Sequence, residues 1–263
     1  MIRIENLKYF YPDSTREILS DISLTFNQNE FTVILGPNGS GKTTLIKLIA
    51  RLIKPTSGKL YLQSKPYDAI NIKEFYRMIS YVPQKFFSIY PYTVFEIVLM
   101  GRSLHFNYFG FENKNDVQKV KEVLQQLGLE HLAKKRINEI SGGELQKVIL
   151  ARSIAQDSEV LLLDEPNTHL DLKHQIQIFD LLKNLQSQGK TIIAVSHDIN
   201  LASFYADRLI FLKDGIIKYD GDITSMLKEA IIEDVFEIEN KVVIDPVDKI
   251  PQLIIKPLRK KLD

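Results

Sequence analysis

The sequence predicts an α/β protein whose core is a parallel sheet covered by helices, and two observations carry this prediction. The apolar run Phe31–Leu35 is followed by a glycine-rich turn and then by residues 43–53, where leucine and isoleucine recur at helical spacing. The short aliphatic runs Val160–Leu163 and Thr191–Val195 flank an amphipathic segment, which is typical of parallel strands buried between helices. Strands and helices therefore alternate as an α/β core requires.

Smaller elements are expected beside this core. Residues 2–35 contain short apolar runs separated by turn residues, which predicts a small antiparallel β-subdomain leading into the core. Between about residues 90 and 156 apolar side chains recur every three and four positions, and Gly128 is placed as a stop, which predicts an inserted helical subdomain. Residues from about 222 onward form a weaker appendix. Because the sequence has no internal repeat, we expect one functional unit.

The composition narrows the class of protein. The 263 residues suit one large domain or a core with small subdomains, and the formal net charge of +1 does not favour nucleic acid or anionic lipid as a partner. The chain has no cysteine, which removes disulfides, thiolate metal sites and cysteine nucleophiles from consideration. No apolar run reaches the ~20 residues of a membrane span, and the N-terminus lacks the layout of a secretory signal. We therefore expect a cytoplasmic protein.

The segment Gly36–Thr43 fits the spacing G-x-x-x-x-G-K-[ST], in which backbone N–H groups and a helix N-terminus cradle phosphates. Lys42 would reach the β- and γ-phosphates, and the hydroxyl of Thr43 would coordinate Mg²⁺. The alternative is an ordinary glycine turn, but this pattern arises by chance in only about one chain in a hundred of this length. With a strand before it and a helix after it, the segment predicts phosphate binding.

Two acids, Asp164 and Glu165, follow the run Val160–Leu163, at the edge where α/β sheets bind ligands. Asp164 is expected to serve Mg²⁺, usually through water, and Glu165 is the natural base for polarising an attacking water. The alternative is a solvated acidic turn, and the phosphate loop weighs against it. The pair therefore predicts hydrolysis of the bound nucleotide.

A second glycine-rich segment begins at Ser141. Ser141 and Glu144 satisfy the capping box S-x-x-E at the start of a helix expected over residues 144–156, and this structural role is a complete explanation of the pattern. The two glycines between them also make a second anion-binding helix terminus, which a single nucleotide does not obviously need.

These residues together make the sequence resemble the ABC ATPase family over residues 1 to about 245. The matching motifs are the Walker A loop Gly36–Thr43, Gln84 of the Q-loop, the signature Ser141–Glu144, the Walker B run Leu161–Asp164 with the catalytic Glu165, the D-loop Thr168–Asp171 and the switch His197. The resemblance implies a P-loop NTPase core over residues 1–245, a C-terminal tail over 246–263, ATP and Mg²⁺ as cofactors, and a homodimer. In such a dimer the signature of one subunit closes on the ATP held by the other.

The resemblance also implies a role for each motif residue. Catalysis is expected from Glu165, His197 and Gln84, and Mg²⁺ binding from Thr43, Gln84 and Asp164. The expected ATP contacts are Tyr11, Gly36, Pro37, Asn38, Gly39, Ser40, Gly41, Lys42, Thr43, Thr44, Ser141, Gly142, Gly143, Glu144 and Asp171.

Four of these residues keep an alternative reading. Gln84 could equally be a surface polar residue after a strand, and only the resemblance gives it a Mg²⁺ and water contact. Tyr11 would stack on adenine, but a core role beside its aromatic neighbours explains it equally well. His197 could merely precede a helix. Glu144 stands where the family commonly has glutamine, and the capping box would turn its carboxylate toward backbone N–H groups.

Two further patterns are rejected. Asn113-Lys-Asn-Asp116 fits the N-K-x-D sequence by which GTPases select guanine, but that motif should end a buried strand, and the polar residues before Asn113 lead into a helix. His169 and His174 are five positions apart, so a helix would not bring them to one face, and we expect no metal site there.

Three functions remain: a transport ATPase docked on membrane subunits, a soluble ABC ATPase acting on ribosomes or DNA, and a regulatory module without turnover. Glu165 and His197 count against the last, and the lack of a second cassette or a long coiled coil counts against the second. The stretches Gly101–Gly110 and Asp164–Gln175 look like ATPases of iron-siderophore, haem and cobalamin importers. Import of zinc, manganese or molybdate stays open.

This likeness implies a protein at the cytoplasmic face of the cell membrane. The permease subunits would dock near Gln84–Arg102, an extracytoplasmic substrate-binding protein would act indirectly, and nucleic acid would have no part. Five aromatic side chains could fill the docking groove, although core packing explains some of them equally well: Phe86, Phe87, Tyr90, Tyr92 and Phe95.

Overall fold

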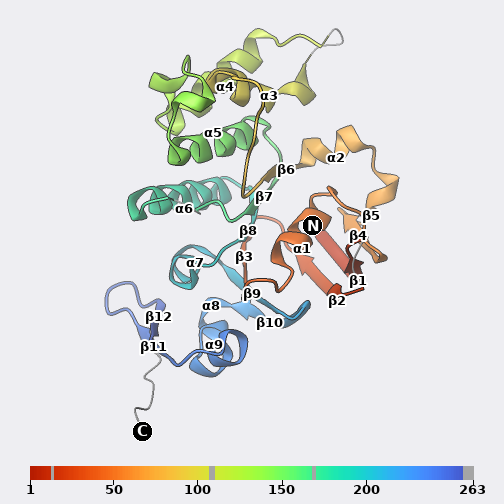
Figure 1. Cartoon of the computed structure of the whole chain (residues 1–263), viewed down its shortest axis with the longest axis vertical. Coiled ribbons are helices and arrows are strands. Elements are labelled where there is room, and N and C mark those ends of the chain that lie inside the picture. The colour runs from red at the N-terminus through yellow and green to blue at the C-terminus, as the bar shows by residue number, and fades with distance from the viewer. Residues whose placement is uncertain (13–14, 107–109, 168–169, 257–263) are drawn as a thin grey trace. The chain divides into compact units, whose positions relative to one another are not determined.

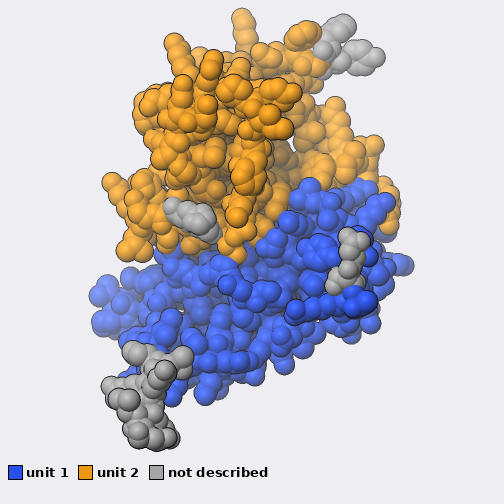
Figure 2. Space-filling view, viewed as in Figure 1, with its two compact units in different colours: residues 1–67, 193–263 blue, residues 68–192 orange. Residues whose placement is uncertain are grey.

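The computed structural model describes residues 1–12, 15–106, 110–167 and 170–256. The chain divides into two compact units, which Figure 2 shows in blue and orange. Unit 1 consists of Met1–Tyr67 and Ile193–Asp263, and unit 2 is the continuous segment Asp68–Ile192. No helix in the described ranges combines the length and the hydropathy that a membrane crossing requires.

The N-terminal part of unit 1 is an antiparallel sheet with the strand order β2-β1-β4-β5. Its strands are β1 (Ile2–Phe10), β2 (Glu17–Phe26), β4 (Ser57–Leu62) and β5 (Lys65–Pro66). In β1 the buried Ile2 and Ile4 lie opposite Phe26 and Leu24 of β2, so these side chains share one covered face. The predicted antiparallel β-subdomain is confirmed.

A second group of strands in unit 1 supports the glycine-rich loop. The fully buried β3 (Phe31–Leu35) pairs in parallel with β9 (Arg208–Lys213), which pairs antiparallel with β10 (Ile216–Asp222). The loop after β3 leads into α1 (Lys42–Ile49), drawn in orange in Figure 1. This helix is shorter than the predicted span of residues 43–53, because the backbone turns left-handed at Arg51, with φ 56°.

The C-terminal part of unit 1 contains α7 (Ile199–Tyr205), α8 (Ile223–Met226), α9 (Glu229–Phe236) and the hairpin of β11 (Asn240–Ile244) and β12 (Pro251–Ile255). Asn200 of α7 ties this hairpin down. Its side-chain amide donates to the carbonyl of Leu253 (3.1 Å) and accepts from the N–H of the same residue (2.7 Å). The expected boundary at residues 245/246 falls in the turn of the hairpin and stays a prediction.

Unit 2 contains a parallel pair of strands. β6 (Ile79–Val82) and β7 (Val160–Asp164) run in register from Ile79 opposite Val160 to Val82 opposite Leu163, so the parallel strand predicted at 160–163 is confirmed. The 3₁₀ helix η1 (Tyr67–Ala69) and α2 (Ile72–Met78) precede β6. After β7, α6 (Leu172–Ser187) leads to β8 (Thr191–Val195), whose residues cross from unit 2 to unit 1 along the chain.

The rest of unit 2 is helical, drawn from gold to green in Figure 1. Its elements are α3 (Val94–Met100), η2 (Ser103–His105), α4 (Lys114–Gln126), η3 (Glu130–Leu132), η4 (Ile137–Glu139) and α5 (Gly142–Ala155). Both α3 and α4 pack against α5. A Cβ at Gly101 would lie 2.1 Å from the carbonyl oxygen of Arg152, so only glycine permits the end of α3 to approach α5 this closely.

Candidate functional site

The glycine-rich loop of unit 1 has a backbone that side chains would disrupt. Gly41 has a φ of 102°, and a Cβ there would lie 2.7 Å from Cδ2 of Leu19. A Cβ at Gly36 would lie 2.0 Å from the carbonyl oxygen of Leu212. Gly36 and Gly41 are therefore required by close packing of the loop against neighbouring parts of the chain.

Inside this loop the side chains of Lys42 and Ser40 are buried. The ammonium of Lys42 donates to the carbonyls of Gly36 (2.8 Å) and Pro37 (2.9 Å), which hold it across the loop. The hydroxyl of Ser40 is buried and has no hydrogen-bond partner within the described residues. A buried polar atom without a partner is costly, and an oxygen-rich ligand such as phosphate would satisfy it.

The start of α1 carries no side-chain cap. Gly41 occupies the N-cap position, and the first turn contains no acidic residue. The positive end of the helix dipole is therefore not neutralised by a carboxylate of its own turn, which favours an external anion.

Tyr11 lies beside this helix. Its hydroxyl is 3.1 Å from Oγ1 of Thr44, its ring forms a T-shaped pair with that of Tyr9, and 40% of the residue is exposed. The ring is thus anchored at its polar end and partly open to solvent, an arrangement compatible with stacking on a base.

In unit 2 the residues Asp164 and Glu165, at the end of β7, are 1% and 7% exposed. Glu165 has a left-handed backbone with φ 52°, which costs free energy for a residue with a side chain and recurs at functional sites. The amide Nε2 of Gln84 donates to Oε2 of Glu165 at 2.6 Å. Gln84 is therefore hydrogen-bonded to the carboxylate of Glu165, the expected base.

Tyr81, which the sequence analysis did not single out, donates its hydroxyl to Oδ2 of Asp164 at 3.4 Å. Burial raises the pKa of this phenol well above its usual value, and the charge of Asp164 and the hydrogen bond to it act in the same direction. Tyr81 therefore stays a neutral donor at physiological pH. No local signal marks it, because its partner lies 83 positions later in the chain.

The predicted capping box at the second glycine-rich segment is confirmed, and the helix begins two residues before the expected position 144. Oε2 of Glu144 accepts from both the N–H and the hydroxyl of Ser141, each at 2.8 Å, and the N–H of Glu144 donates to that hydroxyl at 3.3 Å. These two hydrogen bonds from Ser141 hold the pKa of Glu144 below its usual value. A Cβ at Gly142 would meet nothing within 4 Å, whereas one at Gly143 would lie 3.1 Å from Cδ2 of Leu170.

The remaining motif residues lie at helix starts. Asp171 caps α6 by accepting from the N–H of His174 (2.9 Å), and it also pairs with Nδ1 of that histidine (2.7 Å). Residues 168–169 of the expected D-loop lie outside the described residues. His197 is exposed between β8 and α7. The next residue, Asp198, is the N-cap of α7 and accepts a hydrogen bond from the N–H of Leu201.

The two rejected patterns have structural roles or fall outside the described chain. Asn113 and Asp116 form a capping box at the start of α4, and the buried Asp116 also pairs with Arg102 at 3.1 Å. The N-K-x-D residues thus begin a helix, as expected, and are not placed at the end of a strand. His169 lies outside the described residues, which contain no cluster of potential metal ligands by themselves.

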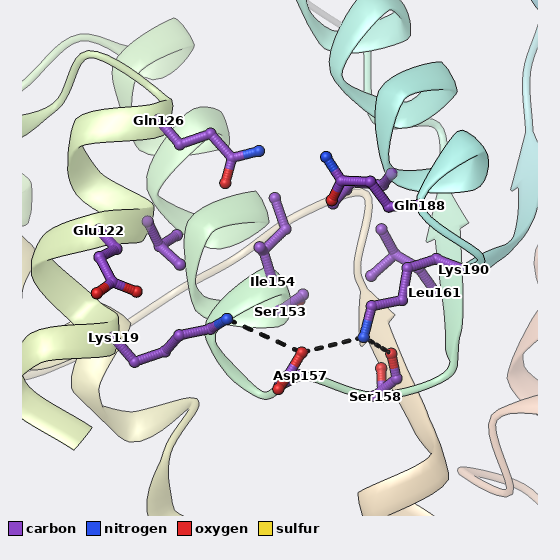
Figure 3. A pocket seen from close by; sticks show the side chains of 12 residues that line it. Lys119, Glu122, Gln126, Ser153, Ile154, Asp157, Ser158, Leu161, Gln188 and Lys190 are labelled. Carbon is purple, nitrogen blue, oxygen red and sulfur yellow. Dashed lines mark hydrogen bonds and ion pairs between the residues drawn. The ribbon is translucent and has the colours of Figure 1, made fainter. Parts of the chain in front are cut away.

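Unit 2 also contains a cavity that none of the predicted site residues lines. Figure 3 shows its lining, where the carboxylate of Asp157 lies between the ammonium groups of Lys119 (4.0 Å) and Lys190 (3.0 Å). Its volume is about 150 Å³, below the roughly 300 Å³ at which pockets for small molecules usually begin. Because Asp157 pairs with both lysines, we interpret the cavity as a packing gap between neighbouring elements and not as a ligand site.

Comparison with known proteins agrees with the motif geometry. The ABC transporter family model matches residues 19–168. The iron(3+)-hydroxamate import ATP-binding protein FhuC of Bacillus subtilis (strain 168) is 35% identical over 243 residues, which cover 92% of this chain and 90% of that protein.

Solved structures of the same family superpose on most of the chain. An inward-facing ABC transporter assigned to the metal-chelate type has a TM-score of 0.83 and 29% identity, covering 97% of this chain and 96% of that one. A dimeric ATP-binding cassette in a post-hydrolysis state, bound to ADP and Pi, has a TM-score of 0.74 and 32% identity, covering 84% and 98%. The predicted fold class is confirmed, and the chain belongs to the ABC transporter family as one of its ATP-binding proteins.

Proposed function

We propose that this chain is the ATP-hydrolysing subunit of an importer that takes up a cargo of the iron-siderophore, haem or cobalamin type through separate membrane subunits. The pair of buried carboxylates at the end of β7, in a chain that also has an uncapped phosphate loop, carries the hydrolytic part of the proposal. The extended similarity to a protein named for iron(3+)-hydroxamate import supports the cargo class.

The residues present fit ATP and Mg²⁺. The Ser40 hydroxyl, which has no hydrogen-bond partner among the described residues, the ammonium of Lys42 and the N-terminus of α1, which has no side-chain cap, suit the phosphates. The oxygen atoms of Thr43 and Asp164 are the kind of ligand that Mg²⁺ prefers. When bound, Mg²⁺ would neutralise charge that develops on the phosphoryl oxygens.

The chain's own residues divide the remaining work. Glu165 would accept a proton from the attacking water or orient it, and the hydrogen bond from Gln84 holds its carboxylate in place. His197, exposed after β8, would contact the γ-phosphate. In a homodimer, Ser141–Glu144 and Asp171 of one subunit would complete the site of the other.

The segment Gln84–Arg102 is proposed as the docking surface for the permease. Phe87, Ile89 and Tyr90 are 86%, 97% and 66% exposed, whereas Val94 and Ile97, which begin and continue α3, are fully buried. Adjacent exposed apolar side chains of this kind mark a surface that another protein covers. Through that contact the chain would lie at the cytoplasmic face of the membrane.

The hydrolytic role is tested with Glu165→Gln, which keeps the shape of the side chain and removes its charge. We expect ATP binding to stay within a few-fold of wild type and turnover to fall at least 100-fold, measured by equilibrium binding and by phosphate release. Glu159→Gln makes the same chemical change at the residue directly before β7, and it serves as the matched control. Turnover near the wild-type rate in Glu165→Gln would remove Glu165 from the mechanism.

The import role is tested by tagging the protein in its native cell, extracting membranes in mild detergent and identifying copurifying proteins by mass spectrometry. Recovery of a polytopic permease that Phe87→Ser/Ile89→Ser loses and Val247→Ser retains supports both the role and the docking surface. The binding protein that accompanies the permease would then distinguish iron-chelate cargo from zinc, manganese or molybdate. Recovery of ribosomal or DNA-bound proteins alone would contradict transport.

A further inference from the structure

Tyr81, near the end of β6, donates a hydrogen bond to Asp164, just as Gln84 donates one to Glu165. Tyr81 lies opposite Leu162 in the parallel register of β6 and β7. Side chains two positions apart on a strand share a face, so Leu162 and Asp164 point to the same side of β7. The phenol of Tyr81 reaches along this side and donates to Oδ2 of Asp164.

The position of Tyr81 is itself fixed by unit 2. Its carbonyl accepts a hydrogen bond from the hydroxyl of Ser153 on α5 at 3.2 Å, and Ser153 is buried. The backbone ladder with β7 holds the residue from the other side. The phenol is therefore held in a defined place beside the carboxylate, and does not reach it from a mobile loop.

The chemistry of the donor suits an acid that must bind a cation. A lysine or arginine at this place would neutralise Asp164 and compete with a metal ion, because the paired charge would no longer attract it. A neutral phenol orients one carboxylate oxygen and leaves the negative charge in place. Partners of this kind commonly raise the affinity of a metal site by fixing the ligand's orientation.

We propose that Tyr81 is a positioning residue for Asp164, and that its hydroxyl fixes the orientation in which this carboxylate meets the Mg²⁺ of the nucleotide complex. The proposal rests on the metal role proposed for Asp164. The O···O separation of 3.4 Å is longer than the ~2.5–3.0 Å of a strong O–H···O bond. The effect of removing the hydroxyl is therefore expected near the lower end of the roughly 10- to 100-fold range known for such partners.

The test compares Tyr81→Phe with wild type in the full chain, using Mn²⁺ as a spectroscopic probe and a non-hydrolysable ATP analogue. Electron paramagnetic resonance measures Mn²⁺ affinity in the nucleotide complex, and fluorescence measures nucleotide binding in EDTA. We expect Mn²⁺ affinity to fall about tenfold, nucleotide binding in EDTA to stay within twofold, and the ATPase rate to recover most of its wild-type value at saturating Mg²⁺.

A matched control is available in unit 1. Tyr219 donates to Oδ2 of Asp234 at 3.1 Å, so Tyr219→Phe removes the same kind of bond away from the motifs and should leave Mn²⁺ affinity unchanged. Wild-type Mn²⁺ affinity in Tyr81→Phe would overturn the proposal. Loss of nucleotide binding in EDTA together with a lower melting temperature would also overturn it, because both would indicate a general structural role.

The variant Asp164→Asn separates this proposal from the one on which it rests. If Asp164→Asn weakens Mn²⁺ binding and Tyr81→Phe adds nothing in that background, the two residues act as one unit and the proposal is supported. If Asp164→Asn leaves Mn²⁺ affinity unchanged, the metal role proposed for Asp164 is wrong, and the role proposed for Tyr81 falls with it. An additive loss in the double variant would contradict positioning through Asp164.

Discussion

Two helices of this protein begin at glycine-rich segments, and they begin differently. The first turn of α1 follows Gly41, which has no side chain to cap it. The first turn of α5 follows Ser141, whose hydroxyl forms a complete capping box with Glu144. Similar glycine content thus yields one terminus that is open to an external anion and one whose donors are partly satisfied by its own chain.

The difference indicates how each segment would meet phosphate. The open terminus of α1 has a buried serine hydroxyl without a partner in the described chain, and a ligand would satisfy it. At α5 a phosphate would have to share Ser141 with the carboxylate of Glu144, which is a like-charged neighbour. We infer that the first segment is built to hold phosphate, and that at the second segment a phosphate would compete with Glu144 for the Ser141 hydroxyl.

The largest expected effect comes from adding one methyl group at each terminus. Gly41→Ala should lower ATP affinity more than 100-fold, because its left-handed φ and the 2.7 Å approach to Leu19 both oppose a Cβ. Gly142→Ala should leave the melting temperature close to that of wild type, since its Cβ would meet nothing within 4 Å. Isothermal titration measures ATP affinity and thermal melting measures stability. Equal losses of ATP affinity in the two variants would contradict the difference between the two termini.

The next effect tests the buried hydroxyl of Ser40. Ser40→Ala removes a buried polar atom that has no partner in the described residues, so the ligand-free protein should be as stable as wild type or about 1 kcal/mol more stable. ATP affinity should nevertheless fall several-fold. Denaturant melts with and without ATP measure the two quantities, and a clear loss of ligand-free stability would show that the hydroxyl has a structural partner.

A smaller effect is expected at the capped terminus. Ser141→Ala should cost about 1 kcal/mol of stability, because both hydrogen bonds of its hydroxyl with Glu144 are lost. Ser141→Thr retains a capping hydroxyl and is the control. Denaturant unfolding measures the cost, and a Ser141→Ala protein as stable as wild type would indicate that the cap contributes nothing.

The smallest effect concerns pH. The pKa of Glu144 is lowered by its hydrogen bonds from Ser141, so its contribution to stability is present above the pKa of the unfolded chain and is lost as pH falls through the lower, folded value. Glu144→Gln should therefore show a slightly weaker loss of stability between neutral and acid pH. Parallel pH series of thermal melts would reveal identical slopes if the carboxylate has no such role.

The sequence predicted the parts of the site whose chemistry is local. The glycines, Lys42 and the box of Ser141 and Glu144 are each recognisable within a few residues. The hydrogen bonds to the carboxylates were not predictable in this way, because Tyr81 and Gln84 lie 83 and 81 positions from their partners and meet them only through the pairing of β6 and β7. Gln84 was named through the family resemblance, whereas Tyr81 was not named at all. The end of α1 was misplaced because a left-handed turn at Arg51 has no compositional signal.

The attachment of the C-terminal hairpin to Asn200 couples the local unfolding of α7 to that of the hairpin. The Asn200 amide bonds both the N–H and the carbonyl of Leu253, which lies 53 positions later, as a neighbouring strand would. Residues of α7, which begins two positions after His197, therefore share contacts with β12, the last strand of the described residues. Hydrogen exchange of the α7 amides should thus report on the integrity of a segment that contains none of the nucleotide motifs.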